Sequence, residues 1–107
     1  MAFFRRRRTA GPARADRSAG LRHLEEWAQS RRGVEAFVEP QTAVTDTTVL
    51  LVAATGEWTR RRVDGPKAAA EFARRISIPV YDAQIVGYPQ RMREWNQRKS
   101  AGGESPG

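Results

Sequence analysis

Two groups of basic residues have the chemistry needed to bind an anionic polymer. The first lies in the segment 58–62, where period-two alternation places Trp58, Arg60 and Arg62 on one face of a strand. Guanidinium groups bind phosphates, and an indole ring stacks on a nucleobase. This strand face is therefore a candidate nucleic-acid-binding surface. In the alternative interpretation, Trp58 covers the edge of the core and the two arginines lie along apolar neighbours.

The second group lies before residue 18. This segment sets six arginines against a single acidic residue, Asp16, and the arginines are Arg5, Arg6, Arg7, Arg8, Arg14 and Arg17. Because like charges repel one another and no apolar pattern is present, we expect residues 1–17 to form a disordered basic tail that binds RNA or DNA. If about four to six phosphates are neutralised, log affinity falls against log salt with a slope of about −4 to −5. A tail that only solubilises the protein is the alternative.

Phe3 and Phe4 precede this arginine run and give it a third interpretation. Two aromatic side chains beside a polybasic segment suit an anionic membrane surface, where each cation contributes about 1 kcal/mol. No stretch of the chain approaches the roughly 20 apolar residues of a membrane span, so we expect no transmembrane segment. The arginines are not followed by an apolar stretch, and we therefore expect no signal peptide. A cytoplasmic location fits these features.

Few residues of this sequence suit catalysis. The chain has no cysteine and a single histidine, His23. These counts exclude a thiol nucleophile, a disulfide and a cysteine-based metal site. We expect His23 to be a solvated residue on the polar side of the first helix, and we expect no metal and no cofactor.

The best candidates for an enzymatic site are four residues close together in sequence, Tyr81, Asp82, Tyr88 and Arg91. A phenol, a carboxylate and a guanidinium in proximity can transfer a proton or hold an anion. In the alternative, the tyrosines pack with their hydroxyls toward water, while Asp82 caps a turn and pairs with Arg91. We favour this structural interpretation, and a non-enzymatic protein.

The elements that position these residues are organised around a β-hairpin over residues 47–63. An unbroken apolar run, residues 48–54, predicts an interior strand, and the half-polar stretch after it predicts a more exposed partner. Gly56 accepts a positive φ at the turn, and a type I turn with a bulge is favoured because threonine precedes it. Since the first strand is apolar on both sides, both faces of the sheet need a cover.

A helix and a strand are predicted before the hairpin. Ser18 is a candidate N-cap, and Leu21, Leu24 and Trp27 follow at helical spacing. Residues 34–39 form a strand that ends before Pro40.

Further elements are predicted after the hairpin. Asp64 is the expected cap of a helix that continues to about residue 76, with a proline in its first turn. Residues 77–81 suit a fourth strand at a sheet edge, because Pro79 lacks an amide donor. Pro89 is expected to begin a last short helix, and residues 97–107 are expected to be disordered.

These elements predict a single α+β domain over residues 18–96. A small antiparallel sheet of three or four strands is covered by two helices, in the order α-β-β-β-α followed by a short strand and helix. The second face of the sheet is covered either by the segment 81–95 or by a second copy of the chain in a homodimer. We favour the segment, because it contains apolar residues that need burial: Tyr81, Ile85, Val86, Met92 and Trp95.

The element order over residues 18–76 resembles the double-stranded RNA-binding domain. Residues 47–76 are similar to the hairpin and the alanine-rich second helix of that family, and the resemblance implies a phosphate contact at Lys67. Trp58 and the arginines on the sheet also resemble the arm-type DNA-binding domains of integrases. As a whole, the chain is similar to small arginine-rich bacterial proteins of unassigned function, some of them labelled oxidoreductase. The stretches that carry this likeness are residues 33–40, 56–62 and 87–92.

The sequence therefore predicts a small binding module for nucleic acid or a ribonucleoprotein. The basic tail and the face with Trp58, Arg60 and Arg62 form the predicted interface. Two alternatives stay open, a protein-interaction or peripheral membrane-surface module and a small enzyme with a site between Tyr81 and Arg91.

Overall fold

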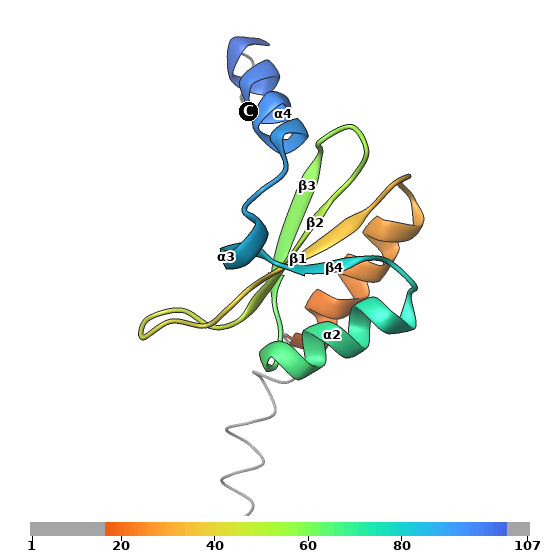
Figure 1. Cartoon of the computed structure of the whole chain (residues 1–107). Helices are drawn as coiled ribbons and strands as arrows, with labels where there is room; N and C mark the ends of the chain where they lie inside the picture. Colours follow the sequence, from red (N-terminus) through yellow and green to blue (C-terminus); the bar gives the residue numbers. More distant parts are fainter. Residues whose placement is uncertain (1–16, 103–107) are drawn as a thin grey trace, which may run out of the picture.

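A four-stranded sheet runs through the middle of the molecule, with helices packed on both of its faces (Figure 1). This computed structural model describes residues 17–102. The strands are β1 (Glu35–Glu39), β2 (Thr48–Val52), β3 (Trp58–Arg62) and β4 (Val80–Asp82), in the spatial order β3-β2-β1-β4. The predicted α+β fold class is confirmed.

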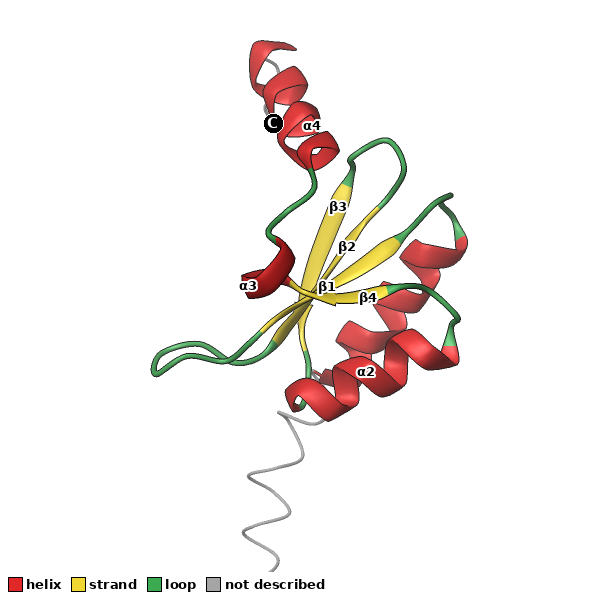
Figure 2. Cartoon of the chain, in the orientation of Figure 1, coloured by secondary structure: helices red, strands yellow, loops and turns green. Residues whose placement is uncertain are grey.

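The sheet is mixed, whereas an antiparallel sheet was expected. β1, β2 and β3 pair antiparallel as predicted, but β4 pairs parallel to β1, with Phe37 opposite Tyr81. A parallel neighbour requires a crossover connection. α2 (Gly65–Arg75) supplies it, because it carries the chain from β3 at one edge of the sheet to β4 at the other (Figure 2).

One face of the sheet is covered by α2 and by an N-terminal helix, residues 17–29, drawn in orange in Figure 1. Ala69, Phe72 and Ala73 of α2 are buried at the spacing of one helical stripe. With Leu24 and Trp27 of the N-terminal helix, they pack on the apolar residues of the sheet. This face is therefore a conventional hydrophobic core.

Two predicted helix caps are wrong. Residue 17 is already helical, so Ser18 lies inside the N-terminal helix and does not cap it. Asp64 precedes α2 but makes no side-chain cap, because its carboxylate lies 3.2 Å from Arg17 Nε. An ion pair between distant parts of the chain has replaced a local hydrogen bond.

The hairpin turn has the predicted form. The Ala53 amide donates to the Glu57 carbonyl (2.8 Å), and the Gly56 amide donates to the Ala53 carbonyl (2.9 Å). Gly56 has a φ of +95°, which gives a type I turn followed by a glycine bulge. The turn also lies against α4 (Gln90–Gly102), since a Cβ at Gly56 would overlap the carbonyl group of Arg91.

The second face is covered by α3 (Ala83–Val86) and by the start of α4. Ala83 and Met92 pack there on Phe37, Leu50 and Val52. The segment 81–95 thus folds across this face, as preferred from the sequence. It covers the face only in part, because other apolar residues of the segment, Ile85 and Val86, are exposed.

α4 continues to Gly102 and extends away from the sheet, so the residues from 97 to 102 are helical where disorder was expected (Figure 1). They have no apolar period, but most are good helix formers. Arg98 and Lys99 also lie over the ring of Trp95, at 5.7 and 4.9 Å from its centroid. Between residues 17 and 102, no helix is long and apolar enough to cross a membrane.

Candidate nucleic-acid interface

Trp58, Arg60 and Arg62 share one face of β3, as the alternation predicts, opposite Val52, Leu50 and Thr48 of β2. Two of the three are held by other parts of the molecule. The indole Nε1 of Trp58 donates to Asn96 Oδ1 of α4 (2.8 Å). Arg60 donates to both carboxylate oxygens of Glu39 on β1, at 2.7 and 2.9 Å. The predicted contact face therefore joins β3 to α4 and β1.

Glu39 is the centre of this polar cluster. It also accepts hydrogen bonds from Thr48 Oγ1 (2.6 Å) and from the Tyr88 hydroxyl. Burial opposes ionisation of Glu39, but the hydrogen bonds from Arg60, Thr48 and Tyr88 outweigh it and lower the pKa of this carboxyl. The same bonds raise the pKa of Arg60 and of Tyr88. Two donor groups of Arg60, Nε and Nη2, are therefore already occupied by Glu39.

Two further predicted arginines, Arg17 and Arg62, lie in the described part of the chain. Arg17 binds Asp46 through Nη2 and Asp64 through Nε, each at 3.2 Å. Arg62 is exposed and lies 3.8 Å from the same Asp46. Arg17 and Arg62 therefore lie at one place, around one carboxylate. The other five predicted residues lie outside the described part of the chain: Arg5, Arg6, Arg7, Arg8 and Arg14.

A groove of about 510 Å³ lies between β3 and the N-terminal helix. Its lining residues come from both elements and from β2: Ala19, Gly20, His23, Thr48, Arg60, Arg61 and Arg62. Gly20 brings the helix close to the strand, because a Cβ there would lie 3.3 Å from the Cβ of Arg61. β3 is an edge strand, so the groove opens at the side of the sheet.

Arg61 also lines this groove, but it does not lie on the strand face that carries Trp58, Arg60 and Arg62. It lies opposite Val49 and therefore points to the side of the N-terminal helix. Its Nη1 donates to the Arg60 carbonyl (2.7 Å) and weakly to Thr59 Oγ1 (3.4 Å). It makes no ion pair with any residue from 17 to 102. Its charge is therefore available to an anion.

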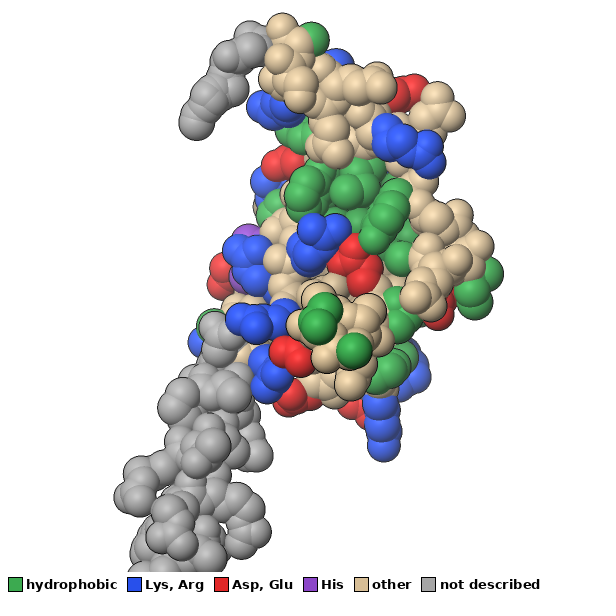
Figure 3. Space-filling view, turned by 90° about the vertical axis from the view of Figure 1, so that its left-hand side faces the viewer, with side chains coloured by type: hydrophobic (Ala, Val, Ile, Leu, Met, Phe, Trp, Pro, Cys, Tyr) green, Lys and Arg blue, Asp and Glu red, His purple; other side chains and the backbone are tan. Residues whose placement is uncertain are grey.

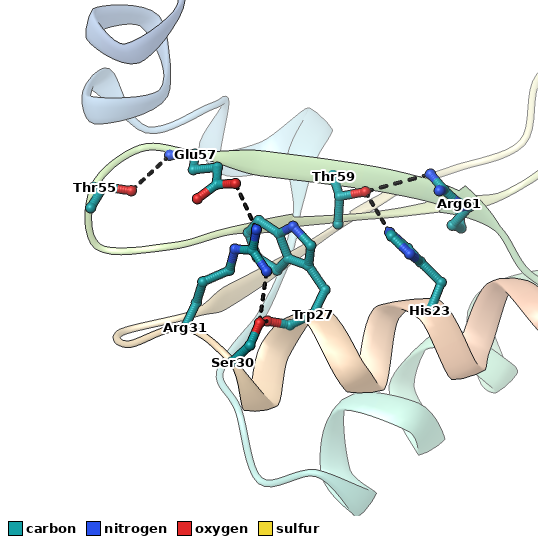
Figure 4. Close-up of polar contacts among 8 residues, drawn as sticks. All are labelled: His23, Trp27, Ser30, Arg31, Thr55, Glu57, Thr59 and Arg61. Atoms are coloured by element: carbon teal, nitrogen blue, oxygen red, sulfur yellow. Dashed lines mark hydrogen bonds and ion pairs between the residues drawn. The ribbon is translucent and has the colours of Figure 1, made fainter.

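His23 faces the same groove from the helix. Its Nε2 lies 2.8 Å from Thr59 Oγ1, so Thr59 is contacted by both His23 and Arg61 (Figure 4). The expectation of a fully solvated His23 is wrong, because the helix turns this side chain toward β3. Burial and the neighbouring guanidinium of Arg61 lower the pKa of His23, and the carboxylate of Glu26 opposes them. His23 is therefore neutral at neutral pH, next to a cation.

The far end of the helix is fixed to the hairpin by a second contact. Arg31 binds Glu57 (2.7 Å), and its guanidinium carbon lies 4.3 Å from the centroid of the Trp27 ring (Figure 4). Since both ends of the helix contact β3 or its turn, the groove has a defined width.

The four residues proposed from sequence for an enzymatic site do not form a single cluster. Arg91 binds Glu35 (2.7 Å) and not Asp82, so the predicted Arg91–Asp82 pair is wrong. The Tyr81 hydroxyl donates to the same Glu35 (3.3 Å), whereas Tyr88 donates to Glu39. Asp82 does cap a turn, since it accepts from the Gln84 amide at 2.8 Å.

These contacts occupy the polar groups of the candidate enzymatic site. A hollow of about 200 Å³ separates the tyrosines, and it is lined mainly by apolar and aromatic groups. Glu35 and Glu39 are each bound to an arginine, so neither carboxylate is a free base. Within residues 17–102, no three His, Asp or Glu side chains are grouped to hold a metal.

Sequence reasoning missed Glu35 and Glu39, which organise the second face of the sheet. Alternation along β1 places Glu35, Phe37 and Glu39 on one side, and this pattern was visible in the sequence. Two carboxylates on a strand face that also carries a buried Phe37 indicate arginine partners on neighbouring elements.

A scan against protein-family models finds no match for this chain, and searches of the curated proteins and of the solved structures find no similar protein.

Proposed function

We propose that this protein binds nucleic acid through the groove between β3 and the N-terminal helix. The observation that carries the proposal is Arg61, an exposed guanidinium in a 510 Å³ groove with no carboxylate bound to it among the described residues. Phosphate groups bind guanidinium by charge-assisted hydrogen bonds. The groove is also open at the sheet edge, so an extended chain can lie along it.

The arginines before residue 17 add to this interface. Arg17 and Arg62 share Asp46, so the described chain begins beside the groove. Arg14 is three residues from Arg17, a distance of at most about 10 Å in an extended chain. Residues 5–14 contain five further arginines, and their positive charges add to the attraction for a polyanion.

The proposal is tested with two variants, each of which replaces one arginine by alanine at a different position. Arg61→Ala removes the groove guanidinium, and Arg74→Ala is the matched control on the exposed surface of α2. With a labelled single-stranded or duplex RNA, Arg61→Ala should weaken binding by about threefold to tenfold and reduce the salt slope by about one. Fluorescence anisotropy between about 50 and 200 mM salt measures both quantities.

Deleting residues 1–16 should reduce the salt slope by about four to five, since it removes five arginines. Equal losses from Arg61→Ala and Arg74→Ala would show that only net charge matters. Binding to anionic vesicles without binding to RNA or DNA would replace this proposal by the membrane-surface alternative.

His23 gives the groove a dependence on pH. Its pKa lies below the ordinary value of 6.5, and a phosphate nearby favours the protonated ring. RNA affinity should therefore rise as the pH falls below 6.5, and His23→Gln should abolish this rise while leaving the affinity at pH 8 unchanged within about a factor of two. A rise of the same size in His23→Gln would remove His23 from the interface.

A further inference from the structure

We propose that the surface formed by β4 and α3 binds a second copy of this chain in a two-fold symmetric dimer. The exposed apolar side chains of this β4–α3 surface are Val80, Tyr81, Ile85, Val86 and Tyr88.

Two aliphatic side chains of α3 are the most exposed residues of this surface. Ile85 is 81% exposed and Val86 is 54% exposed, although α3 lies on the side of the sheet that needs a cover. Among the large hydrophobic residues of the described chain that are exposed, only Val44 lies outside the β4–α3 surface. Figure 3, seen from the side on which α3 lies in Figure 1, shows hydrophobic side chains gathered beneath α4. Contiguous apolar surface of this kind marks a contact with another molecule.

β4 offers a backbone edge at the same place. It pairs with β1 on one side, where the Ala36 amide donates to the Pro79 carbonyl (2.9 Å), and it is the last strand of the sheet on the other. An unpaired edge strand is a template for a strand of another chain. β4 has three residues, so most of the contact must come from side chains.

The β4–α3 surface is complementary to itself. It carries a protruding side chain, Ile85, close to the hollow of about 200 Å³. The hollow is walled by Phe37, Tyr81, Val86 and Tyr88, with Glu35 as its charged member. In a two-fold contact, each copy presents the same patch to the other. The Ile85 of each copy can then fill the hollow of its partner.

The low charge of the β4–α3 surface favours a second copy of this chain over a nucleic acid or an anionic membrane. The chain has a net charge of +7, but residues 80–90 contain no lysine or arginine and one carboxylate, Asp82. Glu35 and Glu39 beside the hollow are already bound to arginines. A nucleic acid or an anionic membrane finds no cation within residues 80–90, and the nearby Arg93 of α4 donates to the Tyr88 carbonyl (3.1 Å), whereas a second cationic copy meets little repulsion at residues 80–90.

The dimer would leave the proposed RNA groove free. β3 and β4 are the two opposite edges of the sheet, so joining two copies at β4 places the two grooves on the outer edges. A long polyanion bound by both grooves would then gain affinity through avidity.

The test compares one substitution at two exposed apolar positions. Ile85→Glu places a charge in the β4–α3 surface, and Val44→Glu is the matched control, since Val44 is 90% exposed in the loop before β2. The full chain is studied by sedimentation equilibrium without nucleic acid, over about a hundredfold range of concentration. Circular dichroism checks that both variants remain folded.

We expect a reversible dimer in the wild type and in Val44→Glu, and at least about tenfold weaker association in Ile85→Glu. A wild-type chain that stays monomeric, or that forms an open series of larger species, would overturn the proposal. Equal weakening in both variants would also overturn it. Because RNA is absent, these results are independent of the Arg61 experiment.

Discussion

The two faces of the sheet are held in different ways. The face under α2 and the N-terminal helix is closed by apolar side chains, among them Leu24, Phe72 and Leu51. The other face has an apolar centre around Leu50, and α4 is also fixed to it by hydrogen-bonded arginines. Arg91 fastens the start of α4 to Glu35 and to the Ala53 carbonyl, at 2.7 and 2.8 Å.

The two kinds of contact have different consequences for the two faces. Apolar burial is non-directional and grows with area, so two helices laid flat on a sheet give a stable core. An arginine that donates several hydrogen bonds fixes the orientation of a neighbouring element through a few atoms. The surface around those atoms stays exposed. The second face can therefore hold α4 and still leave the apolar residues of the β4–α3 surface exposed.

The largest predicted effect is a loss of stability when a buried side chain of the first face is made smaller. Phe72→Ala should lower the free energy of unfolding by about 3 to 5 kcal/mol, because Phe72 is buried among the helices and β2. Met92→Ala on the second face should cost about 2 kcal/mol, since α4 can shift and fill part of the space. Urea denaturation measures both values. A larger loss in Met92→Ala would mean that the second face is the main core.

A smaller effect is expected at the hairpin turn. Gly56→Ala and Gly65→Ala both place a Cβ at positive φ, with φ values of +95° and +89°, at a cost of about 1 to 2 kcal/mol each. At Gly65 nothing lies within 4 Å of the new Cβ, but at Gly56 it overlaps the Arg91 carbonyl. Gly56→Ala should therefore also displace α4.

Amide hydrogen exchange detects this displacement. The amides of α4 should lose protection in Gly56→Ala and keep it in Gly65→Ala. If α4 stays protected in both variants, the turn does not hold this helix.

The smallest effect should come from the Glu39 cluster, and it depends on pH. Since the pKa of Glu39 is lowered in the folded state, its contribution is present above the ordinary value of 4.5 and is lost as the pH falls through the lowered pKa. Glu39→Gln should thus cost about 1 kcal/mol at pH 7 and much less in acid. Urea denaturation at several pH values gives the difference. A cost that is constant with pH would show that the ionised carboxylate contributes nothing.

Local rules predicted much of the fold. The bulged turn at Gly56 follows from a residue that accepts positive φ, and the start of α2 at Gly65 follows from the proline after it. The direction of β4 was not predictable in this way. It depends on how far α2 carries the chain across the sheet, which is a property of the whole fold.

The candidate site was predicted less well, for a related reason. Alternation correctly placed Trp58, Arg60 and Arg62 on one face, but a pattern within one strand does not identify partners on β1 or α4. Arg61 is not on that face, because alternation points it to the other side of the strand, and the groove there depends on the close approach of Gly20. The resemblance to the double-stranded RNA-binding domain stays a prediction, with Lys67 exposed in the first turn of α2.

The parallel pairing of β4 has a consequence for synthesis on the ribosome. β1, β2 and β3 pair with near neighbours in sequence and can form as soon as they emerge, whereas Ala36 must wait for Val80. Until then β1, which contains Phe37, is an unpaired outer strand of the nascent sheet. A chain halted after α2 would expose this strand to other nascent chains, which makes the arrival of β4 the step that protects the newborn protein from aggregation.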